Sequence, residues 1–245
     1  MTKPFFERIA TAAIEKKSPI VLALDTRPRD NQRLPELAAR IIDTVQHHIC
    51  AIKMNFHILL PLSASEIFQI NKLAHSFGLQ SIADIKLNDI EATNYVAVEQ
   101  LVKMGFDAII ANPFIGKNTL ASLVQKAHKE YAGIIALVYM SHPEANEGFG
   151  LKIHGRGLYT MFFERAATAN ADGIVVGATQ DKILEEIRGR LPVYSPGVGA
   201  QGGDPEQAIR NGADYLIIGR SIVEAKQPAK VAGEIQDRIS LSIGK

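Results

Sequence analysis

Eight short apolar runs, spaced almost evenly along the chain, restrict its possible folds more than any other feature. Each run is rich in residues that favour β-strands. The runs lie at residues 20–25, 51–55, 81–86, 108–113, 134–140, 173–178, 192–198 and 215–220. Their ends follow one another at a mean interval of about 28 residues, which is the length of one strand–helix unit.

The segments between the runs have helical periodicity. Residues 35–49 and 65–78 are examples, and the second ends at Gly78, a residue type that often terminates helices. Eight continuously apolar strands alternating with helices predict an α/β fold, a (β/α)₈ TIM barrel, as a single domain over residues 1–245. An open, doubly wound sheet is the alternative. We expect an N-terminal helix, at about residues 3–16, to cap the bottom of the barrel.

Composition excludes several classes of function. The 27 Lys and Arg residues nearly balance the 26 Asp and Glu residues, so net charge does not support nucleic-acid binding. The single cysteine, Cys50, cannot form an intrachain disulfide or a multi-cysteine metal site, and is expected in the core. The sequence contains neither an apolar run of membrane-spanning length nor a signal-peptide pattern at residues 1–17, which favours a cytoplasmic protein.

Charged residues lie near the ends of the first three runs. Asp25 ends the first run, Lys53 lies within the second, and Asp84 and Lys86 end the third. Active sites of TIM barrels lie at the C-terminal ends of the strands. Opposite charges within about 4–6 Å keep one another ionised, so an alternating array can stay charged although partly desolvated. We expect these residues to form a charged pocket at the barrel mouth; interlayer salt bridges inside the barrel are the alternative.

A third carboxylate, Asp89, follows this strand. Taken alone, Asp89 is a favourable residue at a helix N-terminus, and Thr93 and Asn94 are ordinary polar residues of a first turn.

Two glycine-bearing segments predict a phosphate site. Residues 195–205 (SPGVGAQGGDP) follow the seventh run, and residues 217–221 (IIGRS) end the eighth. These are the positions where barrels commonly bind phosphate, and glycine lets the backbone approach an anion closely. Backbone N–H groups and the guanidinium of Arg220 would bind it. The chain has no P-loop motif, so a P-loop nucleotidase is not indicated.

A polar segment at residues 139–150 (YMSHPEANEGFG) follows the fifth run. Ser141 is placed to touch a ligand, and the loop after it is long enough to form a lid. His142 and His154 lack partners at metal-ligand spacing, so we interpret them as solvated or structural and predict no metal site.

The combined motifs resemble those of the orotidine 5′-phosphate decarboxylase family. The pattern D-x-K-x-x-D-I-x-x-T is formed by Asp84, Lys86, Asp89, Ile90 and Thr93, and is followed by PGVGAQGG and a terminal GR. The resemblance runs from about residue 22 to residue 220. It implies a homodimeric carboxy-lyase of de novo pyrimidine (UMP) biosynthesis, which converts orotidine 5′-phosphate to uridine 5′-phosphate and CO₂ with neither metal nor organic cofactor.

The resemblance also implies a role for each site residue. Asp84 would face the substrate carboxylate, and Lys86 would protonate the carbanion at C6. Asp89 and Thr93 would reach the neighbouring subunit's site. Ser141 would contact the pyrimidine, Gln201 and Arg220 the phosphate, and Asp25 and Lys53 the ribose hydroxyls. The implied catalytic residues are Lys53, Asp84, Lys86 and Asp89, and the implied substrate contacts are Asp25, Lys53, Asp84, Thr93, Ser141, Pro196, Gln201, Gly219 and Arg220.

Physical chemistry is consistent with this assignment. Loss of CO₂ from the ring leaves a carbanion without an electron sink, so preorganised charge must stabilise it. A lysine ammonium can do so and then act as the general acid. Two rivals remain open. A phosphosugar lyase of the same superfamily would hold Mg²⁺ with further acidic residues, where this chain has Lys53 and Asn112. A non-catalytic phosphate-binding barrel would not need the alternating charges.

Overall fold

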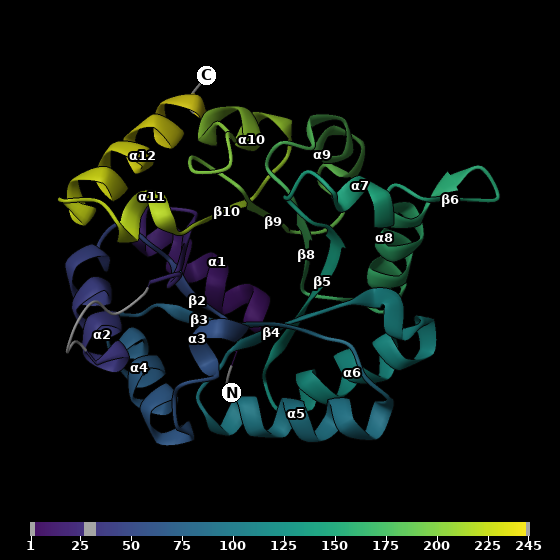
Figure 1. Cartoon of the computed structure of the whole chain (residues 1–245), viewed down its shortest axis with the longest axis horizontal. Helices are drawn as coiled ribbons and strands as arrows, with labels where there is room; N and C mark the ends of the chain where they lie inside the picture. Colours follow the sequence, from purple (N-terminus) through teal and green to yellow (C-terminus); the bar gives the residue numbers. More distant parts are fainter. Residues whose placement is uncertain (1–2, 27–32, 244–245) are drawn as a thin grey trace.

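The computed structural model describes residues 3–26 and 33–243. Eight parallel strands close into a barrel in the order β1-β10-β9-β8-β5-β4-β3-β2 (Figure 1). The strands are β1 (Ile20–Ala23), β2 (Ala51–Asn55), β3 (Gln80–Leu87), β4 (Ala108–Ala111), β5 (Gly133–Tyr139), β8 (Gly173–Val176), β9 (Val193–Pro196) and β10 (Tyr215–Ile218). The predicted TIM barrel is therefore confirmed, and the open sheet was the wrong alternative.

Helices surround the barrel (Figure 1). They are α1 (Phe5–Lys16), α2 (Leu34–Val45), α3 (Phe56–Leu59), α4 (Ala64–Ser76), α5 (Glu91–Lys103), η1 (Pro113–Ile115), α6 (Lys117–Lys129), α7 (Ala145–Gly148), α8 (Leu158–Thr168), α9 (Asp181–Ile187), α10 (Pro205–Asn211), α11 (Arg220–Val223) and α12 (Pro228–Ile243). Helix α4 starts with a capping box between Ser63 and Glu66, and Gly78 follows its end with a φ of 75°. Within the described residues, no helix is long and apolar enough to cross a membrane.

Most of the predicted runs extend past the C-terminal ends of the observed strands. The first run was expected to reach Asp25, but β1 ends at Ala23; the fourth was expected to reach Pro113, but β4 ends at Ala111. Here the chain leaves the sheet to form loops at the barrel mouth. A different departure lies between β5 and α8, where β6 (Lys152–Ile153) and β7 (Arg156–Gly157) form a small antiparallel hairpin.

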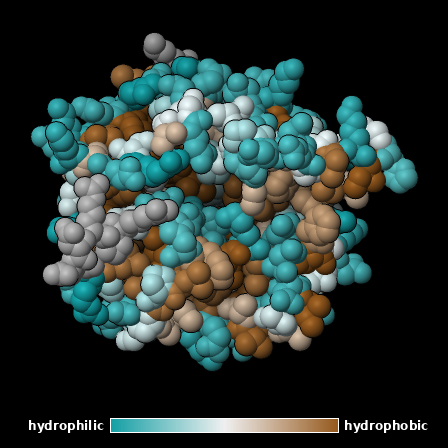
Figure 2. All heavy atoms as spheres, viewed as in Figure 1, coloured by the Kyte–Doolittle hydropathy of each residue, from teal (hydrophilic) through white to brown (hydrophobic). Residues whose placement is uncertain are grey.

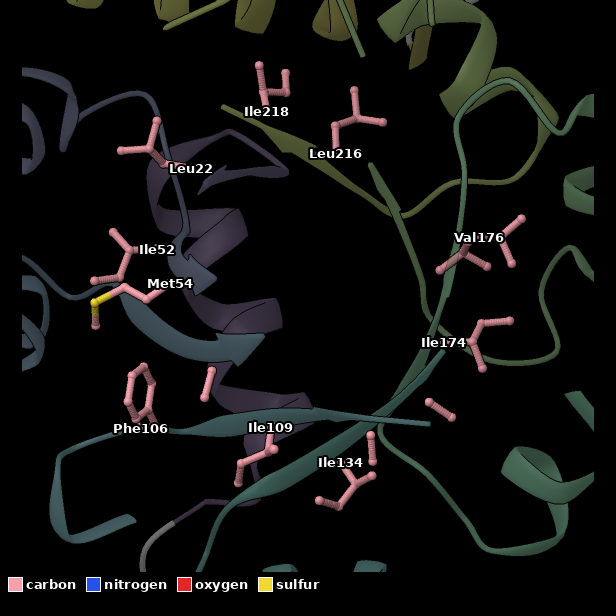
Figure 3. Packing of buried hydrophobic residues seen from close by; sticks show 14 of the residues in the cluster. Leu22, Ile52, Met54, Phe106, Ile109, Ile134, Ile174, Val176, Leu216 and Ile218 are labelled. Carbon is pink, nitrogen blue, oxygen red and sulfur yellow. The ribbon is translucent and has the colours of Figure 1, made fainter. Parts of the chain in front are cut away.

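Alternation along each strand divides the apolar residues between two cores. Leu22, Ile109 and Ile174 point outward from the barrel toward the helices (Figure 3). Val21 belongs to the inner core, together with Cys50, which is fully buried as expected. Burial raises the pKa of the Cys50 thiol to about 12. Both faces of the strands are thus covered, which explains why the runs are continuously apolar.

Helix α1 closes the end of the barrel opposite the strand C-termini. Its residues Phe5 and Ile9 are buried in the inner core. A Cβ on Gly133 would overlap the Phe5 ring, so a glycine at the start of β5 makes room for the helix. Arg8 donates to Gln80 Oε1 at 2.9 Å and to Asp107 Oδ1 at 2.8 Å, near the starts of β3 and β4. The open end of the barrel is therefore the one that carries the charged residues.

Three aspartates hold neighbouring strands in register at the closed end. Each lies directly before a strand and makes two hydrogen bonds with one residue of the adjacent strand. The backbone N–H of the aspartate donates to the carbonyl of that residue, and the aspartate carboxylate accepts from the N–H of that residue at 2.8 Å. The pairs are Asp107 with Ser81, Asp172 with Ile134, and Asp214 with Val193. These register aspartates align β3 with β4, β5 with β8, and β9 with β10.

Asp172→Ala should lower the free energy of unfolding by about 1–3 kcal/mol, because the buried N–H of Ile134 would lose its partner. Denaturation in urea measures this change. Asp43→Ala, at an exposed position on α2, is the matched control and should change stability by less than about 0.5 kcal/mol. Equal changes in the free energy of unfolding for the two variants would contradict the proposed role of Asp172 in strand register.

Candidate active site

A cavity of about 220 Å³ lies at the C-terminal ends of the strands. Figure 2 shows hydrophilic residues gathered around a hollow near the centre of one face of the molecule. The residues expected from the sequence that line the cavity are Asp25, Lys53, Asp84, Lys86, Ser141, Pro196, Gln201, Gly219 and Arg220. Its apolar lining comes from the inner barrel residues Ile110, Leu137, Val175 and Ile217.

Two ammonium groups share one carboxylate in this cavity. Lys53 Nζ donates to Asp84 Oδ2 and Lys86 Nζ donates to Asp84 Oδ1, each at 2.8 Å. Lys53 is 3% exposed and Asp84 is 8% exposed. Burial by itself would raise the pKa of Asp84, but the charges of the two lysines outweigh it and lower the pKa below its ordinary value. The carboxylate is therefore held ionised between two cations.

A backbone irregularity aims Lys86 into the cavity. Its φ of 47° lies in the left-handed region, which costs a non-glycine residue about 1–2 kcal/mol. The pairing of β3 with β4 shifts register between Ala83 and Leu87, which brackets this residue. Strain of this kind persists where the surrounding structure holds it, and it is concentrated at functional sites. The sequence spacing alone indicated a regular strand here.

The glycine loop after β9 is held together by its own backbone. The N–H groups of Gly199, Gly202 and Gly203 donate to carbonyls of the same loop at 2.8–3.0 Å. These three amides are therefore already engaged within the loop, and the binding of an anion by other backbone N–H groups at this strand end stays a prediction. Gly197 has another role: a Cβ there would lie 2.9 Å from Gln201 Oε1 and 3.1 Å from Ser141 Cβ. It lets these two side chains approach the cavity.

Arg220 supplies a cation at the C-terminal end of β10, the strand next to β1. It begins α11 after β10 and is exposed at the cavity. Among the described residues, its side chain has no hydrogen bond or ion pair. The preceding Gly219 lies close to Asp25, since a Cβ on Gly219 would be 3.0 Å from Asp25 Oδ2. The guanidinium is thus available to an anionic ligand.

Asp89 and Thr93 do not line the cavity of their own chain. Both are exposed, Asp89 just before α5 and Thr93 in its first turn. The buried Asn94 holds this turn: its Oδ1 accepts from Asp89 N–H at 3.2 Å and its Nδ2 donates to Asp89 O at 2.7 Å. The fold therefore presents Asp89 outward at a fixed place.

The segment after Ser141 is anchored rather than an open loop. It contains α7 and the β6–β7 hairpin, and the Phe149 ring packs 5.6 Å from Tyr139 and 6.0 Å from Phe162. His142 is exposed and lines the cavity beside Ser141.

A family model identifies the family of this chain. The model described as "Orotidine 5'-phosphate decarboxylase / HUMPS family" matches residues 18–235. The chain belongs to this family. The matched residues run from just before β1 into α12 and include every strand of the barrel.

Members of the orotidine 5′-phosphate decarboxylase family resemble the chain over nearly its full length. The enzyme of that name from Pyrococcus abyssi is 36% identical over 224 residues, which cover 90% of this chain and 98% of the relative. A structure of the Methanocaldococcus jannaschii decarboxylase with the inhibitor BMP has a TM-score of 0.77 and 29% identity, covering 90% and 97% of the two chains. Leishmania donovani UMP synthase shares the fold, with a TM-score of 0.88 and 24% identity, and 57% of that chain is covered.

One polar residue that lines the cavity was not predicted from the sequence. Asn55, the last residue of β2, accepts a hydrogen bond from Lys53 Nζ and donates one to Asp25 Oδ1. An asparagine between a strand and a helix is usually a helix cap, so the pattern gave no reason to single it out.

Lys53→Met should raise the pKa of Asp84, because burial would then be opposed by one lysine charge instead of two. Carbon NMR of labelled aspartate side chains, recorded as a function of pH, measures this shift. Lys152→Met, at an exposed position on the hairpin, should leave the titration of Asp84 unchanged. If the pKa of Asp84 in Lys53→Met equals the parental value, the ion pair between Lys53 and Asp84 does not control the ionisation of Asp84.

Proposed function

We propose that this chain is an orotidine 5′-phosphate decarboxylase that forms uridine 5′-phosphate and CO₂ in de novo pyrimidine biosynthesis. The observation that carries the proposal is the Asp84 carboxylate held between Lys53 and Lys86 in the cavity that Arg220 also lines. Family membership and the full-length similarity to proteins named as this enzyme support it.

In the proposed binding mode, the substrate phosphate lies against Arg220 and Gln201, next to Pro196 and Gly219. Asp25 and Lys53 hold the ribose hydroxyls, and Ser141 contacts the pyrimidine. A ligand anchored at its phosphate brings its reacting carbon to a fixed place beside the charged array. Binding energy from the distant phosphate can then favour the reactive geometry.

In the proposed reaction, the substrate carboxylate faces Asp84. The bond from C6 to the carboxylate breaks, CO₂ leaves, and the electron pair stays on C6. The ammonium of Lys86 stabilises this negative charge as it develops, because its position is fixed before the reaction. A proton then passes from Lys86 Nζ to C6, and the resulting amine regains a proton from solvent. No electron sink from a cofactor enters this scheme.

The geometry favours this reaction over the magnesium-dependent lyase. Both oxygens of Asp84 accept hydrogen bonds from ammonium groups. A divalent cation bound to this carboxylate would therefore lie beside two positive charges, which repel it.

Chelator-treated protein should consume orotidine 5′-phosphate, and the loss of pyrimidine absorbance measures this reaction.

Lys86→Ala should lower kcat by about 10²–10⁴-fold or more, because it removes the general acid, while binding of uridine 5′-phosphate stays measurable by calorimetry. Lys72→Ala, exposed on α4, is the control and should keep parental activity. Turnover that requires added Mg²⁺ would favour the lyase, and a nearly fully active Lys86→Ala would exclude the proposed role of Lys86.

We further propose that the chain forms a homodimer in which Asp89 and Thr93 complete the neighbouring subunit's site. Their exposure outside the chain's own cavity supports this arrangement. Large apolar side chains near them are also exposed: Ile90 is 71% exposed and Val96 is 57% exposed. Phe56, which begins α3 after the adjacent strand β2, and Leu60, which follows α3, are exposed as well. Burial of such residues against a second copy would stabilise the dimer.

Co-expression of Asp89→Asn and Lys86→Ala subunits should restore about one quarter of the wild-type activity. Random pairing makes half the dimers mixed, and each mixed dimer has one site with both original residues. Sedimentation checks the dimer. As the control, co-expression of Asp89→Asn with the double variant Lys86→Ala, Asp89→Asn should restore nothing. Equal activities of the two mixtures would exclude a shared site.

We also propose that the chain acts as one barrel domain in the cytoplasm. The free, buried thiol of Cys50 is compatible with a reducing compartment.

A further inference from the structure

Asn55 joins the two halves of the charged array. Its side-chain oxygen accepts a hydrogen bond from Lys53 Nζ, and its amide Nδ2 donates one to Asp25 Oδ1. Lys53 in turn donates to Asp84, which also accepts from Lys86. The result is a continuous chain of hydrogen bonds across three strand ends in which each donor meets an acceptor. Asn55 is its uncharged member.

Strand register explains why an amide is needed at this place. Ala23 of β1 pairs with Lys53 of β2, and Asn55 of β2 pairs with Asp84 of β3. Asp25 lies two residues beyond Ala23, past the end of β1, and accepts a hydrogen bond from the Asn55 side chain. Position 55 therefore has a carboxylate on either side, Asp25 and Asp84. Lys53, two residues earlier on the same face of β2, pairs with Asp84.

The helix that follows gives independent evidence that the side chain is diverted to the cavity. Asn55 is the N-cap of α3, with extended φ and ψ of −74° and 161°, yet its side chain makes no capping hydrogen bond. Asparagine at this position usually accepts one, which stabilises a helix by about 1 kcal/mol. Asn112, which follows β4, does so: its Oδ1 accepts from Phe114 N–H at 3.0 Å. Asn55 forgoes the cap and binds two charged groups instead.

We propose that Asn55 is a positioning residue that directs Lys53 to Asp84 and keeps Asp25 free of a direct ion pair. Its carbonyl oxygen holds the ammonium of Lys53 from one side, and its NH₂ group gives Asp25 a neutral donor. Asp25 Oδ1 is thereby oriented, and the carboxylate keeps acceptor capacity for ligand hydroxyl groups. Only a side chain with both a donor and an acceptor can serve both neighbours. This assignment of roles rests on the proposed decarboxylase function.

Asn55→Ala should lower kcat/KM for orotidine 5′-phosphate by about 10–100-fold, because Asp25 and Lys53 lose the group that orients them. It should also weaken binding of uridine 5′-phosphate, measured by calorimetry. The matched control is Asn112→Ala, which removes an asparagine from another strand end that does not line the cavity. The control should lower stability through loss of its cap but keep the parental kcat/KM and product affinity.

Asn55→Asp tests the donor function through pH. The new carboxylate would face Asp25, Lys53 and Asp84. The other charged or titratable groups that line the cavity are Lys86, His142 and Arg220. Two adjacent carboxylates raise the pKa of one of them, and the protonated form again donates to its neighbour. The kcat/KM of Asn55→Asp relative to wild type should therefore rise as the pH falls from about 8 to about 5. A ratio that is constant with pH would contradict the donor role.

Crystal structures of the ligand-free wild type and Asn55→Ala separate this inference from the proposed function. The expected change is a shift of Lys53 Nζ from Asp84 toward Asp25, which requires no turnover to observe. A wild type without decarboxylase activity would overturn the function, while this structural comparison would still test Asn55. Unchanged positions of Lys53 and Asp25 in the variant, or a parental kcat/KM, would overturn the positioning role.

Discussion

The structure of the site depends on the Asp84 carboxylate, which two ammonium groups share. Each of these charges would be unfavourable alone in a largely buried cavity, and removal of one partner from a buried pair is strongly destabilising. Together they offset one another, and the pKa of Asp84 is lowered despite its burial. The cavity can therefore hold fixed charges, and in the proposed reaction these charges would stabilise the developing negative charge without rearrangement.

The closed end of the barrel fixes the geometry of the open end. Lys53 and Asn55 face the cavity only in one register of β2, because a shift of one residue would turn both side chains toward the helices. At the far end, Arg8 of α1 and the register aspartate Asp107 hold β3, the neighbour of β2, in register with β4. Residues that never touch a ligand thus determine where the charged groups meet. This separation of stability from chemistry is typical of TIM barrels.

The two sides of the cavity differ in how their backbones contribute. On the β3 side, Lys86 adopts a strained left-handed conformation that directs a flexible side chain. On the β9 side, glycines with positive φ fold a loop onto itself and leave room for Ser141 and Gln201. The first arrangement positions charge and the second shapes the space beside it. The proposed phosphate site, between Gln201 and Arg220, lies on the side of β9 and β10.

The sequence by itself determined the architecture and the location of the site. Eight apolar runs at the spacing of strand–helix units leave few folds other than a barrel, and charges at the run ends mark the open end. Tertiary structure alone decided which groups pair. The hydrogen bonds of Asn55, the register shift around Lys86, the register aspartates and the self-bonded glycine loop depend on register between strands or on backbone torsion angles. Residues that are in contact on neighbouring strands lie far apart in the sequence. The sequence pattern therefore reveals hydrophobic periodicity but does not reveal these contacts.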